Sequence, residues 1–144
     1  MQKEIRHNWH FSQSPEEVWD YLTKPELIEQ WLMKSDFQPI PGHKFHFFGG
    51  CDHKSDKEPK PAAYCEVLEV KPFTMLSYSW QTNSLFDQKP FDSKVVWTLI
   101  PVANGTELQL VHNGFKVLED VVAHNDGWTR CGNKMVEQLN AVQQ

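Results

Sequence analysis

The sequence lacks the features that mark membrane, secreted and nucleic-acid-binding proteins. No apolar run approaches the ~18 residues of a membrane-spanning helix, and no basic stretch followed by an apolar one indicates a signal peptide. Lys and Arg number 14 against 19 Asp and Glu, which gives a net charge of −5, and no basic run offsets this excess. We therefore expect a cytoplasmic protein with no membrane span and no nucleic-acid partner.

Cysteine is scarce as well. The three cysteines form no Cys-x-x-Cys pair and leave an odd one over, so we interpret them as reduced thiols. No Gly-x-Ser-x-Gly motif and no activating pattern around a cysteine predicts nucleophilic catalysis. Five histidines and cysteines gather around one polar stretch with spacings that match no zinc site: His43, His46, Cys51, His53 and Cys65. We expect no metal ion and no other cofactor.

Aromatic residues, by contrast, are abundant. The chain has 144 residues, of which 40% are hydrophobic and 12% aromatic, including six Trp and nine Phe. A domain of this length buries about 70% of its unfolded surface. We expect residues 1–144 to form a single domain with a large aromatic core.

The first third of the chain predicts a strand followed by two short helices. Residues 4–11 alternate between apolar and polar, as a half-buried strand does. Ser14 precedes Pro15, and Glu17 follows three residues after Ser14, which is a capping box at the start of a helix. Pro25 separates this helix from a second one that begins near residues 23–26.

From residue 37 onward the apolar period becomes two, which predicts strands. The first carries Phe45 and Phe47 on one face, and a polar surface loop follows at 49–61. Four more strands are expected at about 62–71, 74–81, 93–101 and 106–115. Asn104-Gly105-Thr106 matches a glycosylation sequon, but Asn-Gly between two strands is also a strong hairpin signal, and we prefer the hairpin.

The last predicted element is a helix over about 120–140. Its apolar residues recur at spacings of three and four: Val121, His124, Trp128, Cys131, Met135 and Leu139. Gly127 and Gly132 interrupt this stripe, and each costs about 1 kcal/mol relative to alanine in a helix interior. Separate blocks of strands and helices indicate an α+β fold with an antiparallel sheet, whose concave face the last helix would cover. We expect Trp128, Met135 and Leu139 to face that sheet.

Four stretches, in this order, carry a resemblance to a known family: "SPEEVWDYLTKPELIEQWL", "EVLEVKPFTMLSYSW", "VVWTLIPVANGTELQLVHNGF" and "HNDGW". The chain resembles the activator-of-Hsp90-ATPase-like family of the START/polyketide-cyclase superfamily. The resemblance implies a helix-grip fold, in which a curved antiparallel sheet wraps around a long C-terminal helix and two short helices follow the first strand. It also implies a cavity between that helix and the sheet, which in many relatives holds a lipid-like, aromatic or polyketide-like molecule.

Gly132 departs from the family pattern, which tends to place a bulky apolar residue there. We interpret this glycine as widening the cavity, since an empty void of that size would be costly, and Gly127 as allowing the helix to start close to the sheet. The alternative is that a neighbouring tryptophan fills the space beside Gly132.

Strand alternation and the helix stripe together predict the residues that bind the ligand. They are His7, Trp9, Phe45, Phe47, Tyr78, Trp80, Trp97, His112, His124, Trp128, Gly132 and Met135. Apolar walls with a few polar groups are typical of a small-molecule pocket, although a large aromatic core has the same composition.

Three functions fit these observations. The one we favour is a non-catalytic binding protein for a small hydrophobic or aromatic molecule, lipid- or polyketide-like. The second is a cyclase- or dehydratase-like enzyme, which requires His112, Tyr78 or His7 to be paired and exposed to the cavity. The third is a regulator of an Hsp90-type chaperone, as the family resemblance implies, although the chain has no room for the additional chaperone-binding domain of the eukaryotic co-chaperone.

Overall fold

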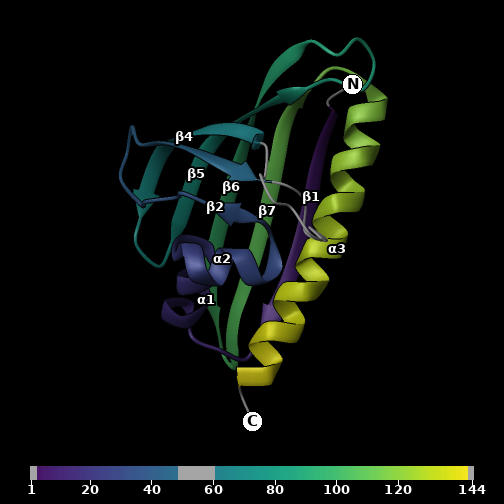
Figure 1. The fold of residues 1–144 in the computed structure, drawn as a ribbon. Coiled ribbons are helices and arrows are strands. Elements are labelled where there is room, and N and C mark those ends of the chain that lie inside the picture. The colour runs from purple at the N-terminus through teal and green to yellow at the C-terminus, as the bar shows by residue number, and fades with distance from the viewer. Residues whose placement is uncertain (1–2, 49–60, 143–144) are drawn as a thin grey trace.

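The computed structural model describes residues 3–48 and 61–142, which form a seven-stranded sheet and three helices (Figure 1). The elements follow in the order β1 (Lys3–Phe11), α1 (Pro15–Thr23), α2 (Pro25–Trp31), β2 (Lys34–Ser35), β3 (Lys44–Phe48), β4 (Pro61–Lys71), β5 (Met75–Asn83), β6 (Pro90–Val102), β7 (Gly105–Phe115) and α3 (Leu118–Val142). Every predicted helix and strand is present. All but the last residue of the predicted loop at 49–61 lies outside the described residues.

The strands are antiparallel to their neighbours, in the order β1-β7-β6-β5-β4-β3-β2. The first and last strands of the chain therefore lie side by side, with Ile5 opposite His112 and Phe11 opposite Thr106. The sequence did not predict β2, because two residues are too short to show an alternating pattern. The observed architecture is the predicted α+β helix-grip fold, with the sheet curved around α3 (Figure 1).

Local signals explain the boundaries of the short helices. The Ser14 side chain accepts a hydrogen bond from the Glu17 amide, and the Glu17 side chain accepts one from the Ser14 amide, so the predicted capping box is confirmed. Lys24 is extended between the two helices. The Trp31 indole then ties them together by donating to the Tyr21 carbonyl over 2.7 Å.

The hairpin between β6 and β7 turns at Ala103 and Asn104, and Gly105 already pairs with Val102 as the first residue of β7. Gly105 has φ of 141°, and a Cβ atom there would lie 1.9 Å from the Phe11 carbonyl oxygen. Only glycine therefore allows the end of β1 to approach the start of β7 so closely. The predicted hairpin is confirmed. Its glycine makes room for the backbone of the neighbouring strand β1.

Helix α3 lies along β1 and packs on the inner face of the sheet (Figure 1). Trp128, Met135 and Leu139 are buried, as their spacing predicted. Gln13 attaches the C-terminal end of this helix to the segment after β1, because its side-chain amide donates to the Leu139 carbonyl over 2.7 Å. The Gln13 carbonyl in turn accepts from the Thr106 hydroxyl over 2.8 Å. None of the described helices has the length and apolar character that crossing a membrane would require.

Candidate functional site

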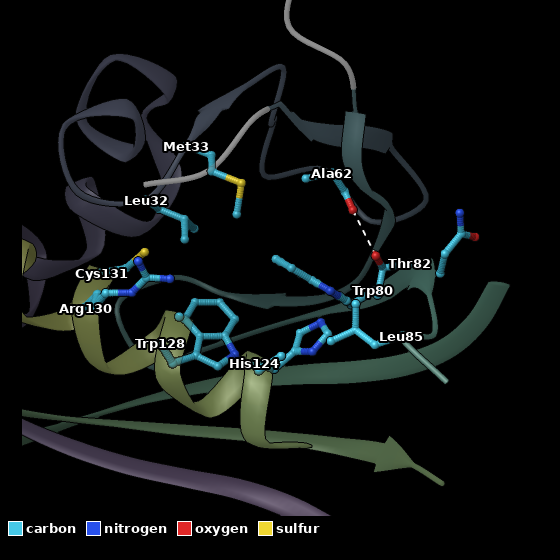
Figure 2. A pocket seen from close by; sticks show the side chains of 13 residues that line it. Leu32, Met33, Ala62, Trp80, Thr82, Leu85, His124, Trp128, Arg130 and Cys131 are labelled. Atoms are coloured by element: carbon cyan, nitrogen blue, oxygen red, sulfur yellow. Dashed lines mark hydrogen bonds between the residues drawn. The ribbon is translucent and has the colours of Figure 1, made fainter. Parts of the chain in front are cut away.

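A pocket of about 270 Å³ opens between α3 and β5 (Figure 2). Its other walls come from the end of α2, the start of β4 and the connection from β5 to β6. The residues that line it are Leu32, Met33, Ala62, Trp80, Thr82, Asn83, Leu85, Ala123, His124, Gly127, Trp128, Arg130 and Cys131. Three of the predicted site residues are therefore brought together here: Trp80, His124 and Trp128.

Two indoles form the apolar walls of the pocket. Trp80 points inward from β5 by the strand alternation, and Trp128 lies in the apolar stripe of α3. Their ring centroids are 5.5 Å apart and their planes are inclined by 52°. Both side chains are almost fully buried, and the Trp80 indole N–H donates to no atom of the described residues. The walls thus combine a large aromatic surface with one unused hydrogen-bond donor.

The two glycines of α3 have the opposite roles from those that the sequence predicted. A Cβ atom on Gly132 would lie 2.3 Å from Cζ2 of Trp9, so the indole of Trp9 already fills the space beside this glycine. The interpretation that Gly132 widens a cavity is therefore wrong, and the alternative of a neighbouring tryptophan is confirmed. Gly127 lines the pocket, and a Cβ atom there would meet nothing within 4 Å. It does not bring the helix start close to the sheet; it leaves open space.

His112 lies behind the pocket, in a series of hydrogen bonds that runs from the Trp128 indole to the Trp80 carbonyl. The Trp128 indole N–H donates to His112 Nδ1 over 3.0 Å, so the proton of this ring is on Nε2. Nε2–H then donates to Ser93 Oγ over 2.7 Å, and the Ser93 hydroxyl donates to the Trp80 carbonyl over 2.9 Å. Burial, and then the neighbouring His124, hold the pKa of His112 well below its ordinary value. His112 is a neutral residue with both nitrogens engaged, and it does not line the pocket.

His124 is the imidazole that does line the pocket. Its Nδ1 lies 2.8 Å from the Asp120 carbonyl oxygen, which can only accept, so Nδ1 carries the proton. Burial lowers the pKa of His124, against the opposing effect of the hydrogen bond to the Asp120 carbonyl and of the Asp120 charge. The ring is therefore neutral near pH 7, with Nε2 as a hydrogen-bond acceptor. Nε2 has no hydrogen-bond partner among the described residues.

Asp120 secures the loop at the mouth of the pocket. Its carboxylate is 2% exposed and accepts from the Ser84 hydroxyl over 2.6 Å and from the Leu85 amide over 2.8 Å. Leu85 lines the pocket, and its own side chain is largely exposed. A buried carboxylate on α3 thus fixes the connection between β5 and β6 against the helix.

Four of the predicted binding residues do not line the pocket and form an aromatic core behind its tryptophan walls: Phe45, Phe47, Tyr78 and Trp97. The Trp97 indole donates to the Tyr78 hydroxyl over 2.9 Å. Tyr78 is fully buried, and this burial raises the pKa of its hydroxyl. Phe45 packs edge-on against Tyr78 at 5.2 Å between ring centroids. The pattern could not separate these residues from pocket residues, because both sets face inward.

The remaining predicted residues, His7, Trp9 and Met135, lie where β1 meets α3 and do not line the pocket. His7 Nε2 is 2.8 Å from the Asn125 side-chain oxygen, and its ring stacks on Trp9 at 5.4 Å. Met135 is fully buried in the core. These contacts join the helix to the first strand.

The mouth of the pocket carries polar groups that alternation did not identify. The Thr82 hydroxyl donates to the Ala62 carbonyl over 3.1 Å (Figure 2). Arg130 forms an ion pair with Asp126 at 3.7 Å. No carboxylate is among the described residues that line the pocket, although the whole chain has a net charge of −5.

No three His, Cys, Asp or Glu side chains are placed to hold a metal ion in the ranges 3–48 and 61–142. Of the metal candidates, His43 and His46 bond instead to the Asp36 carbonyl oxygen and carboxylate. Cys65 is buried, which raises the pKa of its thiol. Cys51 and His53 lie outside the described residues.

Most of the residues that line the pocket were not predicted from the sequence. The face of α3 that lines it could have been found, because His124, Gly127, Trp128 and Cys131 fall on one side of a helix. The other walls come from segment ends with no periodic pattern: Leu32, Met33, Ala62, Asn83 and Leu85. Only the assembled fold brings these ends together.

Comparison with known proteins agrees with this fold. A solved structure of protein MLL2253 from Mesorhizobium loti is 33% identical, with a TM-score of 0.82 and 98% of each chain covered. DynU16, a protein in the dynemicin biosynthetic locus, is 18% identical with a TM-score of 0.75, and the match covers 97% of this chain and 48% of that one. An AHSA1 protein from Silicibacter pomeroyi is 19% identical, with a TM-score of 0.77 and coverage of 98% and 99%.

No protein with a curated description matches the sequence. A family model does match, over residues 12–140, and it describes proteins like Activator of Hsp90 ATPase homolog 1. This range extends from just after β1 to the last turns of α3 and includes every element that lines the pocket. The chain therefore belongs to the Activator of Hsp90 ATPase homolog 1-like family.

Proposed function

We propose that this protein binds a small apolar or aromatic molecule, without transforming it, in the pocket between α3 and β5. The observation that carries the proposal is the open space beside Gly127, which the indoles of Trp80 and Trp128 border. Glycine in a helix interior costs about 1 kcal/mol relative to alanine, and nothing packs on Gly127 to offset this cost. Open space that reduces stability is typical of a binding site.

The size and chemistry of the pocket support a compact ligand. An apolar cavity of roughly 150 Å³ holds benzene, so a pocket of about 270 Å³ is large enough for a body of about two fused rings. A lipid- or polyketide-like molecule with an aromatic or aliphatic end fits this description. DynU16, which shares the fold, is a protein in the dynemicin biosynthetic locus, and this supports a small biosynthetic molecule as the ligand. A cytoplasmic location stays a prediction from the sequence.

The placement of the acid–base candidates supports binding over catalysis. An enzyme of the cyclase or dehydratase type needs His112, Tyr78 or His7 exposed to the cavity, and none of them lines the pocket. His124 does line it, but no side-chain carboxylate among the described residues bonds to its ring. General acid–base chemistry would lack the partner that orients the imidazole.

Two substitutions of Gly127 test the proposal. The wild type should bind the anionic aromatic dye 1-anilinonaphthalene-8-sulfonate with enhanced fluorescence. Gly127→Leu should weaken binding at least ten-fold, because the leucine occupies the pocket. Gly127→Ala is the matched control, since it brings a similar gain in helix propensity but leaves most of the space open, and its affinity should stay near that of the wild type. Equal affinity of the leucine variant and the wild type would refute the proposed site. Native mass spectrometry of freshly purified protein would then show whether a small molecule is retained elsewhere.

A further inference from the structure

Two residues that line the pocket, Trp80 and His124, each have a ring nitrogen with no hydrogen-bond partner among the described residues. Trp80 Nε1 is a buried donor that bonds to no described residue. His124 Nε2 is an acceptor, because Nδ1 holds the only ring proton and bonds to the Asp120 carbonyl. The ring centroids of Trp80 and His124 are 6.2 Å apart with their planes inclined by 75°, and Figure 2 shows the two rings on adjoining walls.

A hydroxyl satisfies both atoms at once with a single oxygen. Its oxygen accepts from the Trp80 N–H, and its hydrogen donates to His124 Nε2. An ether oxygen can only accept, so it would leave Nε2 unpartnered, and a hydrocarbon would leave both atoms unpartnered. Leaving buried polar groups without partners is unfavourable, so the pocket should discriminate between these three kinds of ligand.

We propose that the ligand is an aromatic alcohol, of the phenol or naphthol class, whose hydroxyl lies between Trp80 Nε1 and His124 Nε2. This inference rests on the proposed function and adds the polar group of the ligand to it. The apolar rings would lie along Trp80 and Trp128, on the side of the open space beside Gly127.

Three probes that differ in one group test the inference: 2-naphthol, 2-methoxynaphthalene and naphthalene. Displacement of the fluorescent dye gives the dissociation constant of each. The wild type should bind 2-naphthol roughly two- to ten-fold more tightly than 2-methoxynaphthalene, since one neutral hydrogen bond distinguishes them. In His124→Phe, which keeps an aromatic ring but removes the acceptor, this preference should disappear. The exposed His10 lies outside the pocket, so His10→Phe is the matched control and should retain the preference.

Measuring the affinities of 2-naphthol and 2-methoxynaphthalene for the wild type at a series of pH values tests the role of His124 without a substitution. The titratable groups that face His124 are Asp120 on its own helix and His112 of β7, while β5 and β6 present the aromatic rings of Trp80 and Phe91. When His124 takes up a proton, Nε2 becomes a donor, and the advantage of the naphthol over the ether should vanish. The naphthol hydroxyl itself does not ionise between pH 5 and 7.5.

The outcomes separate the two proposals. If all three probes bind the wild type equally, or if His124→Phe keeps the preference, the hydroxyl site is wrong and the apolar pocket remains. A water molecule already bridging the two atoms would give that first result. If none of the probes displaces the dye, or if the dye does not bind, the proposed function fails and the hydroxyl site with it.

Discussion

The indole of Trp9 lies against the backbone of Gly132, so close that a Cβ atom on the glycine would be 2.3 Å from Cζ2 of the ring. Trp9 is itself held between two neighbours, because it stacks on His7 at 5.4 Å and lies 6.1 Å from Trp97 between ring centroids. Gly132 is therefore the residue that allows α3 and β1 to pack together.

We predict that Gly132→Ala destabilises the protein. The added methyl group would overpack the contact with Trp9 at a cost of about 1–3 kcal/mol in the free energy of unfolding. This cost exceeds the gain of up to about 1 kcal/mol from helix propensity. Urea denaturation measures the difference. In a Trp9→Ala background the clash is absent, so the same alanine should stabilise the protein, and a loss of stability there would contradict this account.

We predict that Gly127→Ala, by contrast, raises the free energy of unfolding of the otherwise unchanged protein. Its new methyl group would meet no atom within 4 Å, so only the helix propensity changes, and unfolding should require up to about 1 kcal/mol more. Thermal unfolding of Gly127→Ala and of Gly132→Ala compares the effect of the same substitution at two positions of α3. Similar effects at both positions would show that the two glycines do not differ in their surroundings.

Stability should fall as the pH drops below about 6.5. His112 and His124 both have a lowered pKa in the folded protein, so below the ordinary value of about 6.5 the unfolded chain takes up protons that the folded chain does not. Each residue then removes about 1.4 kcal/mol of stability per pH unit until its folded pKa is reached. Asp36, whose pKa is also lowered, acts only at more acidic pH, near 3.8.

Urea denaturation between pH 7.5 and 5.5 measures this dependence. His124→Asn should reduce the slope, because one of the two groups is then missing. A stability that is flat over this range would mean that the two imidazoles titrate alike in the folded and unfolded chain.

Asp120→Ala should destabilise the protein by about 2–4 kcal/mol. The substitution leaves the buried Ser84 hydroxyl without its acceptor, which costs about 1–3 kcal/mol, and removes the part-buried hydrogen bond of the Leu85 amide, which contributes about 1 kcal/mol. Hydrogen exchange at the Leu85 amide should also accelerate, since the loop loses its attachment to α3. Asp126→Ala removes an exposed ion pair with Arg130 and should change stability by less than about 0.5 kcal/mol.

Sequence periodicity predicted nearly all of the fold, because alternation and helical spacing record which side of an element is buried. The capping box at Ser14 and the stripe through Trp128 are local signals, and the structure confirms both. The pocket depends on non-local packing. Which glycine of α3 faces open space is decided by Trp9, which comes from a strand more than a hundred residues earlier. No pattern within the helix contains that information.

The candidate site residues show the same limit of sequence-based prediction. Alternation correctly predicted that Trp80 and His112 face inward, but it could not show that one lines the pocket and the other lies behind it. The tautomers of His112 and His124 follow from single hydrogen bonds to Trp128 and to the Asp120 carbonyl. Such bonds are set by atomic positions that periodicity does not encode.

The pairing of β1 with β7 has a consequence for how the protein is made. The ribosome completes β1 at residue 11, but the partner strand begins only at residue 105, so 105 − 11 = 94 residues must be added before the two strands can meet. At roughly 5–20 residues per second this takes about 5–20 s. During that time Ile5 and Phe11 have no strand to pair with, and closing so long a loop is slow because of its entropy cost. The nascent chain therefore exposes an unpaired apolar strand edge, the kind of surface that chaperones bind and that drives aggregation during synthesis.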